Sequence, residues 1–336
     1  MATIIDVAKA ANVSPSTVSR VIADHPRISL KTKRKVREVM KDLAYYPNIQ
    51  ARNLAAKKTM MLGVVMGHSA MLAFQNPFFP EVIRGISATA HARKYGLSLS
   101  TGGTEREILD EVRAMVQSKK VDGIILLYAK DQDPIFEYLR AENFPFVVVG
   151  TPPEHRLETD YIDNNNVALA EELVDYLIAL GHEDIAFVGG DIHYGVTRDR
   201  VKGFEQSYAK HGLEVDAAYY QHNTDHVEET LLKLMQLKNR PTAILTQDDL
   251  MAYEIITHLE RLAICVPDDV SIISINNHAL SNYVRPALTT VEIHIFELGY
   301  KAAEFLCQRI ENPTKKAQHA FVETKLIVRE SCAKRC

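Results

Sequence analysis

Four hydroxyl side chains, one proline and one arginine lie within seven residues near the N-terminus, and side chains of these types at this spacing could bind nucleic acid. The group consists of Ser14, Pro15, Ser16, Thr17, Ser19 and Arg20. A guanidinium matches O6 and N7 of guanine, and hydroxyls can donate to phosphates. We therefore expect Pro15, Ser16 and Arg20 to face base edges, and Thr17 and Ser19 to face phosphates. The alternative is that Arg20 contacts only phosphate.

Residues that could catalyse a reaction do not form any recognised motif. The sequence contains neither G-x-x-x-x-G-K-[ST] nor G-x-S-x-G, and Gly189-Gly190-Asp191 lacks the spacing of a dinucleotide-binding loop. His222 and His226 are four residues apart without an H-E-x-x-H sequence, and Cys332 and Cys336 have no partner pair at finger-like spacing. We expect no enzyme activity, no cofactor and no metal.

Charge is divided unevenly along the chain. Residues 1–58 contain twelve Lys and Arg against four Asp and Glu, a net charge of +8, whereas the rest of the chain carries −12. A basic surface gains affinity for phosphates because it releases condensed counterions. This asymmetry favours a polyanion as the partner of the small basic part, with a solvated helix face as the alternative.

The composition is that of a globular protein. The 336 residues suffice for about two domains, and 46% of them are hydrophobic and 24% charged. No window approaches about 18 consecutive apolar residues, and the N-terminus lacks a signal-peptide pattern, which indicates a cytoplasmic protein. The four cysteines are too few for a disulfide framework, so we expect free thiols.

Local signals in the first 46 residues predict three short helices. Thr3 and Asp6 form a capping-box-like start for a helix ending near Asn12, which can adopt a left-handed turn. Ser14 and Pro15 start a second helix at once, and two helices joined so tightly form a helix-turn-helix. A third helix begins at Ser29 and is expected to stop at Tyr46-Pro47, with an apolar stripe of Val36, Val39, Met40 and Leu43.

From Met61 onward, apolar runs alternate with amphipathic helices. Such runs predict parallel strands that are buried on both faces, and their order predicts two doubly wound lobes. Ligands of these sheets bind at the carboxyl ends of the strands, here in the cleft between the lobes. The strands are expected at 62–66, 97–101, 123–128, 146–150, 185–189, 243–246 and 270–275, and the helices at 79–95, 105–118, 134–141, 167–180, 200–211, 227–237 and 250–259.

The N-terminal motifs resemble the headpiece of the LacI/GalR family. The resemblance is carried by residues 3–21, 28–36 and 46–48, and Asn12 replaces the glycine usual at that position. It implies a three-helix DNA-binding headpiece at 1–46, with Thr3 and Ser14 among its DNA contacts. It also implies a hinge helix at 47–59 that orders on operator DNA, with Asn48, Ala51 and Leu54 at the DNA and Leu54 wedged between base pairs. The alternative is a flexible tether with Leu54 resting on the core.

The resemblance continues through residues 60–336, which are similar to a sugar-binding core built like the periplasmic sugar receptors. Matching stretches are 76–86, 121–125, 163–164, 180–182, 200–204, 248–252, 266–271 and 286–291. The segment 74–80, after an unusually long loop from Gly67 to Ala73, is most similar to maltose-operon repressors of Gram-positive bacteria. The fold class implied is α/β, a helix-turn-helix headpiece and hinge helix followed by a two-lobed, periplasmic-binding-protein-like core.

Matching positions suggest which residues bind an effector sugar between the lobes. Arg200, Asp248 and Asn276 would form hydrogen bonds to it, although many members have Asp at the position of Asn276. Phe79 could instead pack in the core, and Tyr128 and Tyr194 could lie in the pocket or on the surface. The full candidate set is Phe78, Phe79, Tyr128, Asp163, Tyr194, Arg200, Asp248, Asn276 and Tyr283.

The domain organisation and assembly follow from the same resemblance. Lobe 1 is expected at about 60–161 with a return segment at about 292–320, and lobe 2, which Asp163 begins, at about 162–291 with the C-terminal segment. Residues 79–95 and 109–121 resemble the family's dimer interface, and a two-fold dimer would read a palindromic operator. No heptad repeat for a tetramer follows residue 331.

These observations predict a sequence-specific transcriptional regulator, a repressor of a sugar operon, with maltose or maltodextrin as the expected sugar. Its operator affinity would be modulated by a sugar bound between its lobes, and the sequence leaves the sign of that response open. A regulator that needs a corepressor or protein partner is the main alternative. A sugar receptor would leave the charge of +8 unexplained, and a sugar-modifying enzyme would need a catalytic constellation that the sequence lacks.

Overall fold

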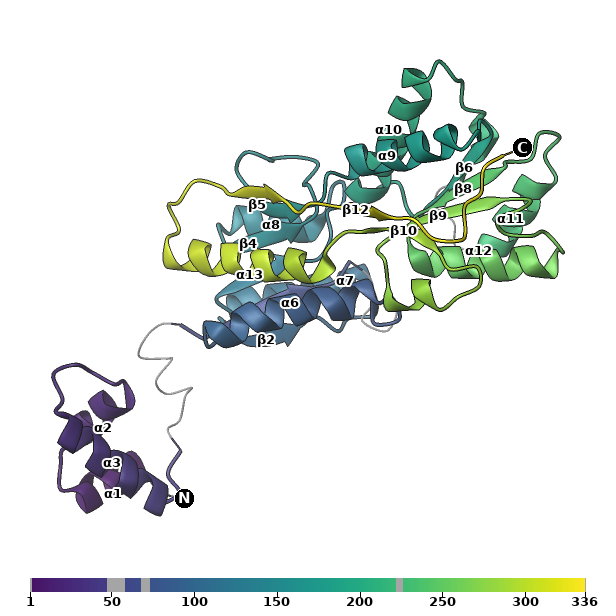
Figure 1. Ribbon diagram of the computed structural model, residues 1–336. Coiled ribbons are helices and arrows are strands. Elements are labelled where there is room, and N and C mark those ends of the chain that lie inside the picture. The colour runs from purple at the N-terminus through teal and green to yellow at the C-terminus, as the bar shows by residue number, and fades with distance from the viewer. Residues whose placement is uncertain (1, 47–57, 68–72, 222–225, 336) are drawn as a thin grey trace. The chain divides into compact units, whose positions relative to one another are not determined.

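The computed structural model describes residues 2–46, 58–67, 73–221 and 226–335, and the chain divides into two compact units, Met1–Thr59 and Met60–Cys336 (Figure 1). The first unit contains α1 (Ile4–Ala11), α2 (Pro15–Ile22) and α3 (Leu30–Asp42). Their apolar faces enclose a small core around Val7, Val18 and Val36. The expected helix-turn-helix is therefore confirmed.

The helix starts follow from capping side chains. Thr3 and Asp6 form a reciprocal capping box, and the Ser14 and Ser29 hydroxyls accept hydrogen bonds from the N–H groups of Thr17 and Thr32. Asn12 adopts the left-handed turn (φ 51°, ψ 51°) that glycine would otherwise supply.

The end of α3 differs from the prediction. The helix stops at Asp42, and Ala44 takes a positive φ of 46°, so the turn precedes Tyr46-Pro47. Leu43 is 37% exposed and lies outside the core. The proline comes after the turn that already ends the helix.

The second unit contains two six-stranded sheets. The first has the order β11-β5-β4-β3-β1-β2 and is parallel throughout, and the second has the order β12-β10-β9-β8-β6-β7, in which only β12 is antiparallel to its neighbour. The first sheet consists of β1 (Met61–Val65), β2 (Gly96–Leu99), β3 (Gly123–Leu126), β4 (Phe146–Val149), β5 (Asp160–Asp163) and β11 (His319–Phe321). The second consists of β6 (Ile185–Val188), β7 (Tyr220–Gln221), β8 (Ala243–Thr246), β9 (Ser271–Ile275), β10 (Thr289–Glu292) and β12 (Lys325–Ile327).

Helices cover these sheets because the strands are apolar on both faces. Around the first sheet lie α6 (Phe78–Ala92), α7 (Glu105–Gln117), α8 (Pro134–Ala141) and α13 (Ile295–Glu311). Around the second lie α9 (Asn166–Ala179), α10 (Gly195–Lys210), α11 (Val227–Met235) and α12 (Asp249–Arg261), with the short 3-10 helices η1 (Ala217–Tyr219) and η2 (Ala279–Asn282). The predicted two doubly wound lobes are confirmed.

Several elements were not predicted. These are the short strands β5, β7, β10, β11 and β12, none of which has a long apolar run. β5, for example, carries an Asp at each end. Helix α13 was not predicted either, although it has a clear apolar stripe that includes Leu298, Ala302 and Leu306. Two boundaries also differ, because α10 begins five residues before Arg200, and Asp163 ends a strand of the first sheet instead of beginning the second lobe.

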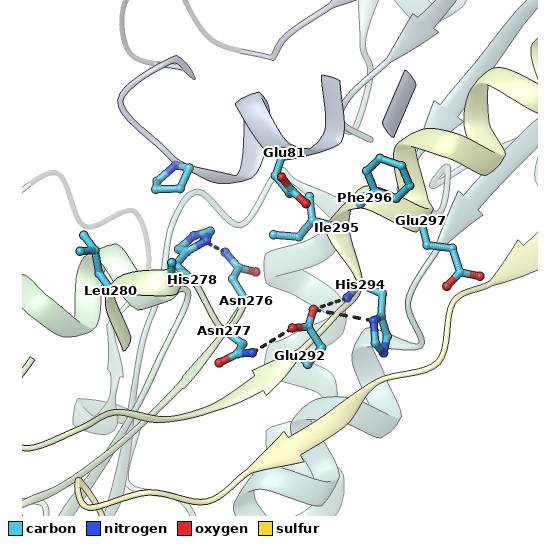
Figure 2. Close-up of a pocket in the computed structure, with 12 residues that line it drawn as sticks. Glu81, Asn276, Asn277, His278, Leu280, Glu292, His294, Ile295, Phe296 and Glu297 are labelled. Atoms are coloured by element: carbon cyan, nitrogen blue, oxygen red, sulfur yellow. Dashed lines mark hydrogen bonds and ion pairs between the residues drawn. The ribbon is translucent and has the colours of Figure 1, made fainter. Parts of the chain in front are cut away.

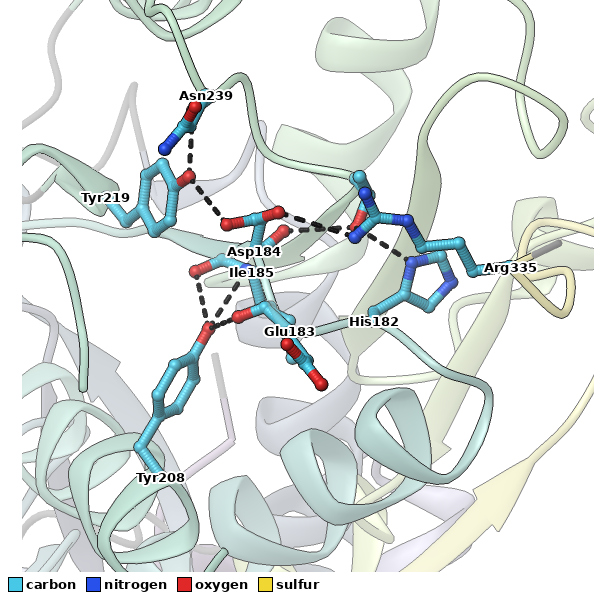
Figure 3. A network of polar contacts seen from close by, with 9 residues as sticks. His182, Glu183, Asp184, Ile185, Tyr208, Tyr219, Asn239 and Arg335 are labelled. Carbon is cyan, nitrogen blue, oxygen red and sulfur yellow. Dashed lines mark hydrogen bonds and ion pairs between the residues drawn. The ribbon is translucent and has the colours of Figure 1, made fainter. Parts of the chain in front are cut away.

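Hydrogen bonds and an ion pair hold the C-terminal segment, residues 328–335, against the second lobe (Figure 3). The Arg335 N–H donates to the Leu180 carbonyl at 2.8 Å, and the Arg335 guanidinium lies 3.3 Å from the Asp184 carboxylate. His182 Nε2 is 3.0 Å from the Ala333 carbonyl, and the Tyr219 hydroxyl donates to Asp184 at 3.2 Å. The chain after β12 is therefore an integral part of this lobe.

Two further expectations concern cysteines and membranes. No disulfide joins Cys265, Cys307 or Cys332, as predicted, and Cys336 lies outside the described residues. Within the described ranges, none of the helices combines the length and apolar character needed to cross a membrane.

Helices α6 and α13 lie side by side with their backbones in close approach (Figure 1). A Cβ at Gly299 would lie 2.0 Å from the Val82 carbonyl oxygen, and one at Gly85 would lie 2.0 Å from the Phe296 carbonyl oxygen. Glycine on each helix is therefore what permits this packing.

We expect Gly299→Ala to destabilise the core, although alanine is favoured over glycine in a helix by about 1 kcal/mol. The clash with a rigid backbone oxygen should cost more, about 1–3 kcal/mol net, because α6 and α13 must separate. Urea unfolding followed by circular dichroism measures the change. Gly103→Ala is the control, since its added Cβ would meet only the end of the Glu107 side chain, at 3.4 Å. Equal midpoints for the two variants would contradict the packing argument.

Candidate functional site

The second helix of the headpiece presents the expected polar face. Val18 and Val21 are buried against the other helices, whereas Pro15, Ser16, Ser19 and Arg20 are exposed and Thr17 is partly exposed. The Ser14 hydroxyl caps the helix at 3.2 Å from the Thr17 N–H and also contacts the Ser16 hydroxyl at 2.8 Å. Thr3 is exposed and is engaged by the Asp6 carboxylate. The helix is thus held rigidly while its outer face stays accessible.

The basic residues of the headpiece differ in how far they are already paired. Lys33 is buried and lies 3.0 Å from the Asp24 carboxylate, and Arg37 lies 2.7 Å from the same carboxylate. Arg34 contacts Glu38 at 3.2 Å. The Arg20 carbonyl accepts from the His25 N–H, but its guanidinium has no hydrogen-bond or ion-pair partner within residues 2–46. Part of the charge of +8 therefore stabilises the folded headpiece, whereas the Arg20 guanidinium is available to bind a partner.

The expected hinge contacts Asn48, Ala51 and Leu54 lie outside the described residues, so they stay predictions.

Eight of the nine candidate effector residues line one cavity of about 500 Å³ in the core. They come from both sheets: Phe78 and Phe79 from the start of α6, Tyr128 after β3, Asp163 at the end of β5, Tyr194 and Arg200 from α10 and its cap, Asp248 before α12 and Asn276 after β9. Every strand involved contributes its carboxyl end, as the topology requires. The cavity also resolves an alternative, because Tyr128 and Tyr194 line it and their rings meet edge to face at 6.2 Å.

Tyr283 is the exception. It follows the 3-10 helix η2, is 74% exposed and does not line this cavity. Tyr283 was expected as one of three possible ring faces for the sugar, with Phe78 and Tyr194, and it is the one that lies outside the cavity. For Phe79, core packing was the alternative to a place in the cavity. Phe79 packs against the core and also lines the cavity.

Arg200 is the main cation of the cavity. Its Nε donates to Asn166 Oδ1 at 3.1 Å and its Nη1 donates to the Gln247 carbonyl, so other guanidinium N–H groups have no partner in the part of the chain that the structure describes. Burial lowers the pKa of the Arg200 guanidinium to about 10, and the Asp248 and Asp163 carboxylates oppose that shift. Arg200 therefore stays charged near neutral pH and can donate to a ligand.

Asp163 organises the cavity wall. One carboxylate oxygen accepts from the Thr151 N–H at 2.7 Å and hydroxyl at 2.8 Å, and the other accepts from the Asn164 N–H at 2.8 Å and Asn166 Nδ2 at 3.0 Å. Burial raises the pKa of the Asp163 carboxyl to about 6, while these donors act in the opposite direction. With four donors already in place, Asp163 mainly positions other residues.

Asp248 and Asn76 connect the two lobes across the cavity. Asn76 Nδ2, before α6, donates to one Asp248 oxygen at 3.0 Å, and the Met251 N–H donates to the other at 3.0 Å. Asp248 is thus both the cap of α12 and a contact between lobes.

The candidate set omits several polar residues of the cavity, among them Asn76, Asn166 and Gln247. Gln247 is the most informative, because its Nε2 donates to the Thr197 hydroxyl at 3.2 Å while its buried Oε1 has no hydrogen-bond partner among the residues that the structure describes. A buried acceptor without a partner is costly unless a ligand or water satisfies it. Gln247 stands directly before Asp248 at a strand end, a signal that the sequence did offer.

Asn276 lines both this cavity and a second one of about 640 Å³, whose lining is drawn in Figure 2. Its backbone has a φ of 115°, and its side-chain nitrogen lies 3.5 Å from His278 Nε2. On the far side lie Glu81, Glu292 and His294, and Asn277 Nδ2 donates to Glu292 at 2.8 Å. Asn276 therefore touches two cavities at once.

One group of side chains in the described ranges could in principle hold a metal: Glu137, Glu154 and His155. Arg140 already contacts it, 3.2 Å from His155 Nδ1 and 3.7 Å from Glu137. The guanidinium supplies the positive charge that an ion would otherwise bring.

We expect Asn164→Ala to destabilise the core by about 2–4 kcal/mol. Asn164 Nδ2 donates to the Ile293 carbonyl at 3.1 Å and to the Val322 carbonyl at 3.0 Å, so alanine leaves two buried acceptors unpaired. Urea unfolding measures the loss. Asn165→Ala is the matched control, because it removes only an exposed helix cap worth about 1 kcal/mol. A smaller loss for the Asn164 variant than for the control would refute this role.

Comparisons with known proteins agree with both units. A model for bacterial regulatory proteins of the lacI family matches residues 3–48, and one for a periplasmic binding protein-like domain matches residues 174–332. The HTH-type transcriptional regulator MalR of Staphylococcus xylosus is 35% identical over 334 residues, which cover 98% of each chain.

Solved structures give the same result. A transcriptional regulator LacI from Bacillus cereus subsp. cytotoxis NVH 391-98 is 42% identical with a TM-score of 0.82, covering 83% of this chain and all of that one. A complex of the transcriptional regulator CelR with cellobiose is 25% identical with a TM-score of 0.77, covering 98% of this chain and all of that one. Because the similarity spans headpiece and core together, the chain belongs to the LacI family of bacterial DNA-binding transcriptional regulators.

Proposed function

We propose that this regulator is a homodimeric repressor that binds a palindromic operator and is released from it by maltose or a short maltodextrin in the cavity of about 500 Å³. The observation that carries the proposal is the lining of that cavity. Arg200 offers donors, Gln247 offers a buried acceptor, and Phe78, Tyr128 and Tyr194 offer ring faces. Sugars need this combination of hydrogen bonds and apolar contact, and the volume lies within the usual range for small-molecule sites.

Maltose is favoured over other sugars by similarity. Relatives named MalR in Staphylococcus xylosus and Streptococcus pneumoniae are 35% and 36% identical over nearly the whole chain. The cellobiose bound by the structural relative CelR supports a disaccharide as the size of ligand.

A two-fold dimer is favoured by the size of the headpiece. One helix such as α2 reads only a few base pairs, and a second headpiece in the same assembly binds the other half-site at high effective concentration. The effector then acts by coupling: if maltose binds better to the form that does not hold DNA, operator affinity must fall by the factor by which DNA weakens maltose binding.

The decisive experiment measures operator affinity by fluorescence anisotropy on a palindromic library at fixed salt, with and without maltose. Couplings of this kind are typically about 5- to 150-fold, so we expect maltose to raise the operator Kd within that range. Arg200→Lys should keep operator binding and lose most of the response, because lysine cannot reproduce the guanidinium fork. Tight operator binding that no maltodextrin changes would reject maltose and favour a regulator that needs a corepressor.

We expect Arg20→Ala to weaken operator binding about 10- to 100-fold for each half-site contact with guanine. Arg34→Ala is the control, since Arg34 is an exposed headpiece arginine already paired with Glu38. Replacing the contacted guanine in the operator should remove the difference between wild type and Arg20→Ala. If the variant instead weakens all sequences equally and lowers the salt slope by about one, Arg20 contacts only phosphate.

A further inference from the structure

Two loops meet across the cleft on one side of the cavity. One is the segment 127–133 between β3 and α8 in the first lobe, and the other is the segment 189–194 between β6 and α10 in the second lobe, continuing into the first turn of α10. Both line the cavity, through Tyr128 and Ala129 on one side and Asp191, Tyr194 and Thr197 on the other. A ligand in the cavity therefore lies directly behind this junction.

The junction is built from backbone hydrogen bonds. The Gly195 N–H donates to the Ala129 carbonyl at 2.9 Å, and the Asp131 N–H donates to the His193 carbonyl at 3.0 Å. These bonds form an antiparallel bridge between Lys130 and Tyr194. The bridge is a single pair of residues, and it joins two lobes whose sheets are otherwise separate.

Side chains reinforce the bridge. The Asp131 carboxylate pairs with the Arg198 guanidinium, and both side chains are about one-third exposed (35% and 37%). The Lys130 ammonium lies 5.6 Å from the centre of the Tyr194 ring, and the Tyr194 hydroxyl donates to the Gly67 carbonyl at 3.1 Å. Each of these contacts joins the first lobe to the second, so all of them must break when the lobes separate here.

The lobes are also joined by the Asn76–Asp248 hydrogen bond and by the chain itself. The chain passes between the sheets after β5, after β10 and between β11 and β12, and Asn164 holds these passages together through the Ile293 and Val322 carbonyls. This cross-link is buried, whereas the loop junction is partly exposed and rests on few contacts. Separation of the lobes at the loop junction therefore breaks only non-covalent, partly exposed contacts, whereas separation at the chain passages would break the buried Asn164 bonds.

We propose that segments 127–133 and 189–198 form a latch that opens as a unit to expose the cavity, and that the Asp131–Arg198 ion pair sets how often it opens. The gating of an effector rests on the proposed function; the opening itself does not. The pair touches no ligand position, so it governs the rate of entry and release and leaves the contacts of the cavity intact.

The test measures hydrogen exchange of the Asp131 and Gly195 amides by NMR on the full-length protein without sugar. A partly exposed ion pair is worth up to about 1 kcal/mol, so Asp131→Asn and Arg198→Met should each raise exchange of both amides together by about fivefold. The swapped pair, Asp131→Arg with Arg198→Asp, should restore slow exchange. The Val322 amide, which donates to the Asp163 carbonyl at 2.8 Å, should stay protected in every variant.

The control is Asp110→Asn, which removes a more exposed Asp–Arg pair, with Arg113, that lies inside α7 and away from the latch. Exchange at the two latch amides that is unchanged in Asp131→Asn, or that rises equally at Val322, overturns the latch. Release of radiolabelled maltose should also be about fivefold faster from Asp131→Asn, and an unchanged release rate would overturn its gating role. If wild type binds no maltose, the proposed effector is wrong, and the exchange result still decides the latch.

Discussion

The amide of Asn164 is the interaction on which the core depends. A chain that builds two sheets and passes between them repeatedly leaves carbonyl groups at each passage that neither sheet can pair. Asn164 satisfies two of them, from Ile293 and Val322, and its own N–H is taken by Asp163. One buried side chain thereby links the chain passage after β5 to the passages after β10 and between β11 and β12.

This constraint explains why the cavity lies where it does. Asn164 itself lines the cavity, and the strand-end residues Asp163, Asp248 and Asn276 converge there without being close in sequence. Near them Arg200 supplies a buried guanidinium, whose pKa burial lowers to about 10. Asp163 belongs to the first sheet, and Asp248 follows a strand of the second. The electrostatic attraction between the Arg200 guanidinium and these two carboxylates therefore depends on how the lobes are arranged. A ligand bound to Arg200 therefore acts on that arrangement.

The sequence predicted most of this architecture because its signals are local. Ser14-Pro15 sets a helix start by itself, and apolar runs such as Ile124–Leu126 identify a buried strand from composition alone. β5 was not predicted because the buried carboxylate of Asp160 depends on Arg309 and Gln318, partners that are distant in sequence. Gln247 escaped for a similar reason, since an acceptor without a partner is visible only once its neighbours are placed.

Positions carried over from a family depend on whether the local backbone repeats. Asn276 keeps its place in the cavity although the residue type differs from that of many members, because its location follows from the end of β9. Tyr283 does not, because seven residues of loop and 3-10 helix separate it from that strand end, and their path is set by the buried Asp249 carboxylate, which holds the His278 N–H at 2.7 Å and the Ser281 hydroxyl at 2.6 Å. A residue fixed by a strand end can be inferred from sequence, whereas one fixed by a loop requires the contacts that shape the loop.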